Sequence, residues 1–133
     1  MSERNVVRLD EADTGVLHGR VGTFRILIDE RKVGATSHAV LVNTMRAGVV
    51  GDEHSHADSD QSMYVLSGTG TFFVDGRPHR IGPEMALYAP AGSAHRIEVD
   101  PDADLTYLVF YAPAGPEQLL RERGERAFDA DAA

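Results

Sequence analysis

The segment DEHSHADSDQSMYVLSG, residues 52–68, contains side chains that could bind a metal ion. His54 and His56 are separated by one residue, and Gln61 follows five residues after the second histidine. On a β-strand, side chains at positions i and i+2 point to the same side, so both imidazoles could reach one ion. Gln61 would open the next strand, from which its amide could reach the same point. These residues predict a metal site with imidazole nitrogen and amide oxygen as ligand atoms.

A third histidine could complete this site. His95 lies in the segment APAGSAHRI, residues 89–97, just after a Pro-x-Gly turn and at the start of another alternating strand. From that position it could supply a third imidazole, so that three neutral nitrogens and one amide oxygen would surround the ion. A lone His-x-His pair is more often two surface or hydrogen-bonded histidines, so the prediction depends on the whole pattern.

The whole pattern resembles the first motif of the cupin family. The matching residues are two glycines at the ends and three candidate ligands between them, at the family's spacings: Gly48, His54, His56, Gln61 and Gly68. The second cupin motif is similar to PAGSAH, which supplies its proline, glycine and histidine: Pro90, Gly92 and His95.

Three positions depart from the cupin pattern. Cupins usually have glutamate at the position of Gln61, glycine at that of Glu84 and asparagine at that of Val99. The resemblance covers residues 36–113. It implies an all-β fold, the cupin double-stranded β-helix or jelly-roll barrel, with a metal ion held inside by the four side chains proposed above. It also implies a homodimer, in which the strand-rich N-terminal segment could pair across the subunit boundary.

The composition favours one domain that binds a small molecule. The chain has 133 residues, enough for a single core, and we expect one cupin domain over residues 1–133. Its formal net charge of -8 and the lack of a basic cluster argue against nucleic acid or an anionic membrane as the main partner. It has no cysteine, so nitrogen and oxygen atoms must bind any metal. No signal-peptide-like or membrane-spanning apolar run is present, which predicts a soluble cytoplasmic protein.

The elements that must position the candidate ligands have the pattern of short strands. From residue 23 to 111, apolar or alternating segments are broken by glycine, proline and aspartate, at spacings typical of an antiparallel sandwich or barrel. An Asp-Gly pair within VDGRP, residues 74–78, predicts a hairpin turn. After Pro113, the segment GPEQLLRERGER predicts a short C-terminal helix packed on the barrel exterior. The predicted strands are 23–30, 37–48, 51–57, 61–68, 70–76, 77–82, 85–92, 94–99 and 104–113.

A glutamine at the fourth ligand position changes the chemistry expected of the metal ion. Because Gln61 is neutral, it leaves the full charge of a divalent ion uncompensated, whereas a glutamate would reduce that charge by one unit. The ion should then be a harder Lewis acid, and since an amide cannot serve as a general base, proton transfer would need another group. Imidazole and amide ligands accept zinc, manganese, iron, nickel or cobalt, and one or two positions would stay open for a carbonyl or enol.

The pocket around the ion is predicted from the inward positions of the same strands. Its wall would be mostly apolar, which favours an aromatic or otherwise poorly hydrated substrate over a sugar. Simple core packing would account for each of these residues at least as well. The predicted wall residues are Met63, Val65, Ile97 and Val109.

The catalytic candidates are polar side chains that these strands could turn toward the pocket: His38, Tyr88 and Tyr107. The two tyrosines would donate hydrogen bonds to a substrate. His38 could act as a base or as an extra ligand, although an exposed or core histidine is the more common outcome for such a residue.

Three functions remain open. The leading hypothesis is a metal-dependent enzyme that polarises a carbonyl or enol of a small, fairly apolar substrate and promotes cyclisation or isomerisation. It is supported by RILIDERKVGATS, residues 25–37, which is similar to the segment before the metal-binding strand of cupin-type aromatic polyketide cyclases. The second is an iron or nickel dioxygenase of a flavonol- or diketone-like substrate, and the third is a non-catalytic binding barrel. Cupins that open unsaturated uronates share the ligand set, but they carry an aspartate where this chain has Val109.

Overall fold

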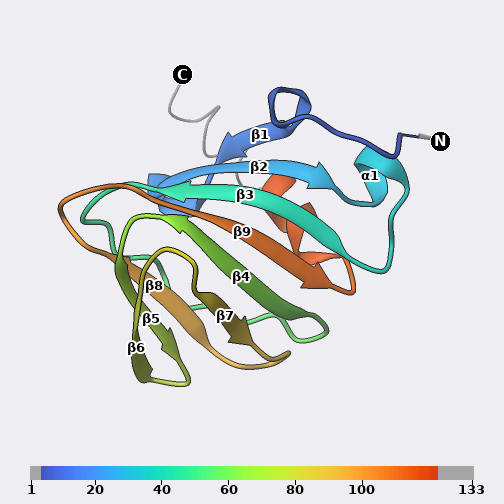
Figure 1. The fold of residues 1–133 in the computed structure, drawn as a ribbon. Coiled ribbons are helices and arrows are strands. Elements are labelled where there is room, and N and C mark those ends of the chain that lie inside the picture. Colours follow the sequence, from blue (N-terminus) through green and yellow to red (C-terminus); the bar gives the residue numbers. More distant parts are fainter. Residues whose placement is uncertain (1–3, 123–133) are drawn as a thin grey trace.

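Two antiparallel sheets enclose the core of the protein (Figure 1). The structure, a computed structural model, describes residues 4–122. The larger sheet has six strands, in the order β1 (Asp13–Val16), β2 (Gly22–Ile28), β3 (Ala39–Met45), β9 (Leu105–Ala112), β4 (Asp60–Ser67) and β7 (Ala86–Ala89). The smaller sheet has three strands, in the order β6 (Arg77–Ile81), β5 (Gly70–Val74) and β8 (His95–Val99). The prediction of an all-β jelly-roll built from short antiparallel strands is confirmed.

The core lies between the sheets because inward positions alternate with outward ones along each strand. In β4, Gln61, Met63 and Val65 are buried, while the side chains between them are half-buried or exposed. This strand pairs with β9, so that Met63 lies opposite Val109 and Val65 lies opposite Tyr107. The smaller sheet contributes the facing half of the same apolar cluster: Phe72, Ile81, Ile97 and Val99.

Two glycines show why the chain turns where it does. The β5–β6 hairpin turns at the predicted Asp-Gly pair, where Asp75 has a φ of 49° and Gly76 a φ of 80°. Positive φ at both positions matches the twist of the flanking strands, so the predicted hairpin is confirmed. Gly68, between β4 and β5, has a φ of 91°, and a Cβ at this position would lie 2.3 Å from the carbonyl oxygen of Asp104. Only glycine fits there.

The prediction of a strand at residues 51–57 is wrong. This segment lies beside β8 but forms only two isolated antiparallel bridges with it, from Val50 to Glu98 and from His54 to His95. The bridged residues are four positions apart on the segment and three apart on β8, so the segment carries one extra residue and cannot continue a regular ladder. The two candidate ligands at 54 and 56 are therefore held by an irregular, bulged segment.

The N-terminal part of the chain adds an edge strand to its own sheet. After the short helix η1 (Leu9–Glu11), β1 pairs with β2, and η2 (His18–Arg20) connects the two strands. The predicted strand 23–30 ends at Ile28, because the Asp29 side chain accepts a hydrogen bond from the Lys32 N–H and caps the helix α1 (Glu30–Val33).

The C-terminal segment is helical over residues 116–122, and the remainder of the predicted helix, residues 123–126, lies outside the described part of the chain. Its position is fixed by Arg121, whose guanidinium lies 3.0 Å from a carboxylate oxygen of Asp29 and 2.9 Å from one of Asp13. Leu120 packs against the core and lines the pocket described below. The helical segment therefore contributes to the wall of that pocket, which the sequence did not predict. Within residues 4–122, no helix combines the length and apolar character that crossing a membrane requires.

Candidate metal centre and pocket

Three histidines converge between the two sheets. The potential ligand atoms of His54, His56 and His95 all lie within 4.8 Å of one another. Two backbone hydrogen bonds, of 3.0 and 2.8 Å, join His54 to His95 and bring the bulged segment against the start of β8. His54 is exposed, His56 is half-buried and His95 is buried, so the cluster extends from the surface into the interior. This is the convergence that the sequence predicted, although it is produced by a bulge and not by strand alternation.

Backbone carbonyls orient two of the imidazoles. Nδ1 of His54 lies 3.0 Å from the carbonyl oxygen of Asp52, and Nδ1 of His95 lies 3.2 Å from that of Ser93. When the proton is on Nδ1, the N–H donates to the carbonyl two residues earlier in the chain and Nε2 keeps its lone pair. Such a contact fixes the tautomer and the direction of a metal-binding histidine.

Gln61 turns its amide oxygen toward the histidines. Its side chain is buried at the start of β4, and its Oε1 lies 3.0 Å from Nε2 of His95. The amide nitrogen points the other way and donates to the sulfur of Met63 at 3.4 Å. Within the part of the chain that the structure describes, no carboxylate belongs to the histidine cluster. The four donor groups are therefore all uncharged.

The contact between His95 and Gln61 tests whether these residues fit a metal ion. A neutral imidazole has one N–H, so His95 cannot donate to both the Ser93 carbonyl and the Gln61 carbonyl. Double protonation is disfavoured, because burial and then the charge of His54 lower the pKa of His95 to about 4. With the proton on Nδ1, as the Ser93 contact requires, the lone pairs of Nε2 and Oε1 face each other; with the proton on Nε2, the Ser93 carbonyl is left without its donor. Ligand atoms about 2.1 Å from one ion and at right angles to each other are separated by about 3.0 Å, so the geometry fits a cation.

His56 also has a ring nitrogen that is available to a metal ion. Its Nε2 is buried and has no hydrogen-bond partner, although buried polar atoms are nearly always paired. Burial, followed by the charge of His54, lowers the pKa of His56 to about 4. The imidazole is thus neutral at physiological pH, with a lone pair available. Three imidazoles and an amide oxygen are donors that zinc, manganese, iron, nickel and cobalt ions all accept.

A pocket of about 230 Å³ opens beside the cluster. Its wall is mainly apolar and is formed by both sheets and by the C-terminal helix, which contributes Pro116, Leu119 and Leu120. At the mouth, His18 and Asp52 lie 3.9 Å apart. The remaining wall includes Leu17, Val21, Asn43, Met45, Met63, Ile97, Tyr107 and Tyr111.

The structure brings some of the predicted pocket residues together and not others. Met63, Ile97 and Tyr107 line the pocket. Val65 and Val109 are fully buried in the core and do not line it. Their inward direction is as predicted, but they belong to the apolar core.

Two of the three catalytic candidates lie away from the pocket. Tyr88 is 56% exposed and lies opposite Ser62, on the outward positions of β7 and β4. His38 precedes β3, is exposed, and has its Nδ1 at 2.9 Å from the Ser37 hydroxyl. Since Leu87 and Ala39 point inward, their neighbours must point outward. The expectation that Tyr88 and His38 face the cavity is therefore corrected.

The predicted pocket residues did not include Asn43, Tyr111, His18 or Asp52, which line this pocket. Tyr111 presents its ring to that of His56, with the ring centres 5.3 Å apart. Asn43 lies on β3 opposite Tyr107 of β9. Both were accessible from alternation, since Asn43 shares the inward direction of Leu41, and Tyr111 shares that of Val109.

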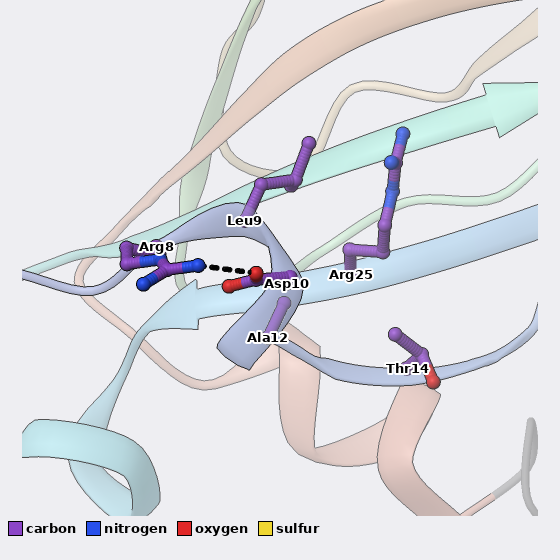
Figure 2. Close-up of a pocket in the computed structure, with 6 residues that line it drawn as sticks. All are labelled: Arg8, Leu9, Asp10, Ala12, Thr14 and Arg25. Atoms are coloured by element: carbon purple, nitrogen blue, oxygen red, sulfur yellow. Dashed lines mark hydrogen bonds and ion pairs between the residues drawn. The ribbon is translucent and has the colours of Figure 1, made fainter.

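A second depression lies over the N-terminal strands and shares none of these residues. Figure 2 shows Arg8, Leu9, Asp10 and Ala12 on one side and Thr14 and Arg25 on the other. It is wide and shallow, with a volume of about 600 Å³. Arg8 forms an ion pair with Asp10 at 2.6 Å, and the Arg25 guanidinium donates to the Thr44 hydroxyl at 3.3 Å. We find no chemistry there comparable to the histidine cluster.

Comparison with known proteins identifies relatives of the sequence. Residues 41–111 match the family model of the cupin domain. Tetracenomycin polyketide synthase protein TcmJ of Streptomyces glaucescens is 33% identical over 103 residues, which are 77% of this chain and 69% of that protein. Polyketide synthase CurC of Streptomyces cyaneus is 29% identical over 101 residues, which are 76% of this chain and 66% of that protein. The chain thus spans about two thirds of the length of these relatives.

Solved structures match the fold. KdgF from Halomonas sp. superposes with a TM-score of 0.72 at 20% identity, over 86% of this chain and 98% of that one. The polyketide cyclase RemF from Streptomyces resistomycificus superposes with a TM-score of 0.71 at 24% identity, over 86% of this chain and 81% of that one. At these identities the likeness establishes the two-sheet architecture.

Proposed function

This chain belongs to the cupin family, and we propose that it is a metal-dependent enzyme of polyketide tailoring, with cyclase- or isomerase-like chemistry on a carbonyl or enol. The observation that carries the proposal is the convergence of three neutral imidazoles with the Gln61 amide oxygen, which lies 3.0 Å from His95 Nε2, next to a buried His56 Nε2 that has no hydrogen-bond partner. The family relatives named as polyketide synthase proteins support the substrate class. The mainly apolar wall supports it as well, because such a wall favours poorly hydrated aromatic compounds.

The uncharged ligand set determines which chemistry is favoured. Bound by His54, His56, Gln61 and His95, a divalent ion would supply Lewis-acid polarisation of a substrate oxygen. The Gln61 amide holds its position by donating to Met63 and cannot accept a proton. Apolar side chains such as Ile97 and Leu120 exclude water from the oxygen that is polarised.

The pocket tyrosines serve as hydrogen-bond donors and not as bases. Burial raises the pKa of Tyr107 to about 12, and it raises the pKa of Tyr111 as well. Both hydroxyls therefore keep their protons at physiological pH. A proton removed from the substrate must be accepted elsewhere, and the His18 imidazole and the Asp52 carboxylate at the mouth of the pocket are the side chains we propose for this role.

The metal content of the purified protein tests the first part of this proposal. Elemental analysis of purified protein should give about one divalent ion per chain, and His54→Ala and His95→Ala should each lose it. His79→Ala, at an exposed position of β6, is the matched control and should keep the ion. Unchanged metal content in both ligand variants would end the proposal.

Hydrogen exchange at the carbon beside a substrate carbonyl tests the proposed enolisation. Exchange of the proton beside the carbonyl of α-tetralone, followed by NMR in heavy water, should be faster with wild-type protein than with His95→Ala. Equal rates would contradict enolisation chemistry. Oxygen consumption with benzoylacetone would instead favour the dioxygenase hypothesis, and binding without turnover of either compound would favour a non-catalytic binding protein.

We also propose that the protein is a homodimer, through the outer face of the larger sheet. Phe110 and Tyr88 flank Ser62 on this face, and Tyr64 follows on the same strand. The three aromatic side chains are 36%, 56% and 38% exposed, respectively, which is unusual for a surface that stays in water. Light scattering should give twice the chain mass, and Tyr88→Asp should give monomers. A monomeric wild-type protein at micromolar concentration would contradict the dimer.

A further inference from the structure

The wall of the pocket contains a polar pair that the metal site does not use. Asn43 of β3 and Tyr107 of β9 lie directly opposite each other across the strand pair. Both line the pocket, and they are only 4% and 6% exposed. Their neighbours on the inward positions of the two strands, Leu41 and Val109, are fully buried and apolar. An amide and a phenol in such a wall need hydrogen-bond partners.

The two side chains satisfy each other only in part. Burial raises the pKa of Tyr107 to about 12, and the Asn43 side chain beside its hydroxyl acts in the opposite direction. A phenol hydroxyl both donates and accepts, so the Tyr107 O–H can donate to a ligand in the pocket. The Asn43 carbonyl oxygen is buried and has no partner among the described residues. One acceptor and one donor thus remain available at the same place.

This pair is separated from the proposed metal ligands. Gln61 lies opposite Tyr111 on β9, and Tyr107 lies four residues earlier on the same strand. Four residues of extended strand span about 13 Å between Cα positions. Besides His18 and Asp52 at its mouth, the pocket is therefore polar at the proposed metal ligands and at this pair, with the apolar Met63 on the strand between them. A ligand that satisfies both must carry two oxygen functions on an apolar body.

We infer that Asn43 and Tyr107 form a recognition site for a second hydroxyl group of the substrate, distal to the carbonyl or enol oxygen that the proposed metal site would bind. A phenolic hydroxyl fits, because it can donate to the Asn43 carbonyl and accept from the Tyr107 O–H at the same time. This inference rests on the proposed function and specifies its substrate: a polyhydroxylated aromatic ketone is favoured over an analogue without the distal hydroxyl.

Two anthraquinones form a matched pair of probes for this site. Chrysophanol and emodin share a hydroxyketone that can bind a metal ion, and emodin carries one additional hydroxyl on the distal ring. Titration of metal-loaded protein, followed by fluorescence, should give a dissociation constant about tenfold lower for emodin. In Asn43→Leu, a substitution of similar volume, the two constants should become equal within about twofold, because the acceptor is gone and the cost of leaving it unpaired is removed.

Further variants separate this role from a structural one. Tyr107→Phe should lose part of the preference for emodin and keep the metal ion, which provides a test even if Asn43→Leu fails to fold. Thr44→Val is the matched control: Thr44 follows Asn43, points outward, and bonds the Thr106 hydroxyl at 3.0 Å. It should keep the full preference.

The outcomes distinguish this inference from the proposed function. A wild-type protein that holds its metal ion but binds both probes equally, or binds neither, overturns the hydroxyl site and leaves the metal enzyme standing. An unchanged preference for emodin in both Asn43→Leu and Tyr107→Phe also overturns it. A wild-type protein that binds no metal overturns the proposed function, from which this inference follows.

Discussion

Nε2 of His95 lies 3.0 Å from Oε1 of Gln61, although the Nδ1 side of the same ring contacts the Ser93 carbonyl. One ring proton can serve only one of these contacts, whereas a cation bound by Nε2 and Oε1 would allow the proton to stay on Nδ1 and satisfy all three groups. The orphaned Nε2 of His56 beside them has the same explanation. This contact leads to predictions about metal affinity and about the pH dependence of stability. Further predictions concern the elements that shape the pocket.

Gln61→Glu should strengthen metal binding. The substitution keeps the length of the side chain and adds a negative charge to an otherwise neutral ligand set, which should lower the dissociation constant for a divalent ion on the order of tenfold. Gln61→Leu should weaken binding, because it removes the fourth donor. Competition with a chelator measures both. Equal affinities in the three proteins would mean that Gln61 is not a ligand.

Metal-free protein should lose stability as the pH falls from 6.5 toward 4. The pKa of His56 and that of His95 are lowered from 6.5 to about 4, by burial first and by the charge of His54 second. Between these pH values the unfolded chain binds more protons than the folded one, so unfolding is favoured as pH decreases, by about 1.4 kcal/mol per pH unit for each proton. Denaturant titrations across this range measure the slope, and His95→Gln should reduce it. A slope that is the same in wild type and variant would contradict the assignment.

Arg121→Ala should destabilise the protein and disturb the pocket. Arg121 and Asp29 form an ion pair with side chains 7% and 0% exposed, and removal of one partner leaves a buried charge. The expected loss is about 3 to 5 kcal/mol of unfolding free energy. Arg80→Ala removes an exposed partner of Asp100 and should change stability far less. Chemical denaturation compares the two. Similar losses would mean that residues 116–122 are not held by this pair.

Gly68→Ala should destabilise more than Gly76→Ala. Both glycines have positive φ, at 91° and 80°, so each substitution strains the backbone by about 1 kcal/mol. At Gly68 the new Cβ would also lie 2.3 Å from the Asp104 carbonyl oxygen, whereas at Gly76 nothing lies within 4 Å. Melting temperatures of the two variants test the difference. Equal values would show that the β4–β5 turn relaxes without cost.

Local patterns predicted most of the fold but not the segment that carries two candidate ligands. Alternation placed the strands from β2 to β9, and the Asp-Gly pair predicted the hairpin. The bulge between Val50 and His54 arises from pairing with β8, more than forty residues away in the chain, and local pattern does not encode it.

Local sequence pattern also predicted part of the candidate site, but not the part that depends on contacts between distant segments. Spacing predicted that His54, His56, Gln61 and His95 lie together, and this was correct. Tyr88 was misplaced, although its neighbours Leu87 and Ala89 point inward and alternation would have put it outside. The contribution of residues 116–122 to the pocket depends on the tertiary pair of Arg121 with Asp29. No sequence pattern near either residue indicates that pair.

The most direct test of the central claim is an anomalous difference map from crystals of the protein grown with a divalent metal ion. The proposed metal site predicts one strong peak per chain at about 2.0 to 2.3 Å from Nε2 of His54, His56 and His95 and from Oε1 of Gln61. It would be contradicted by a map without a peak among these four side chains, or by a peak that Gln61 does not contact.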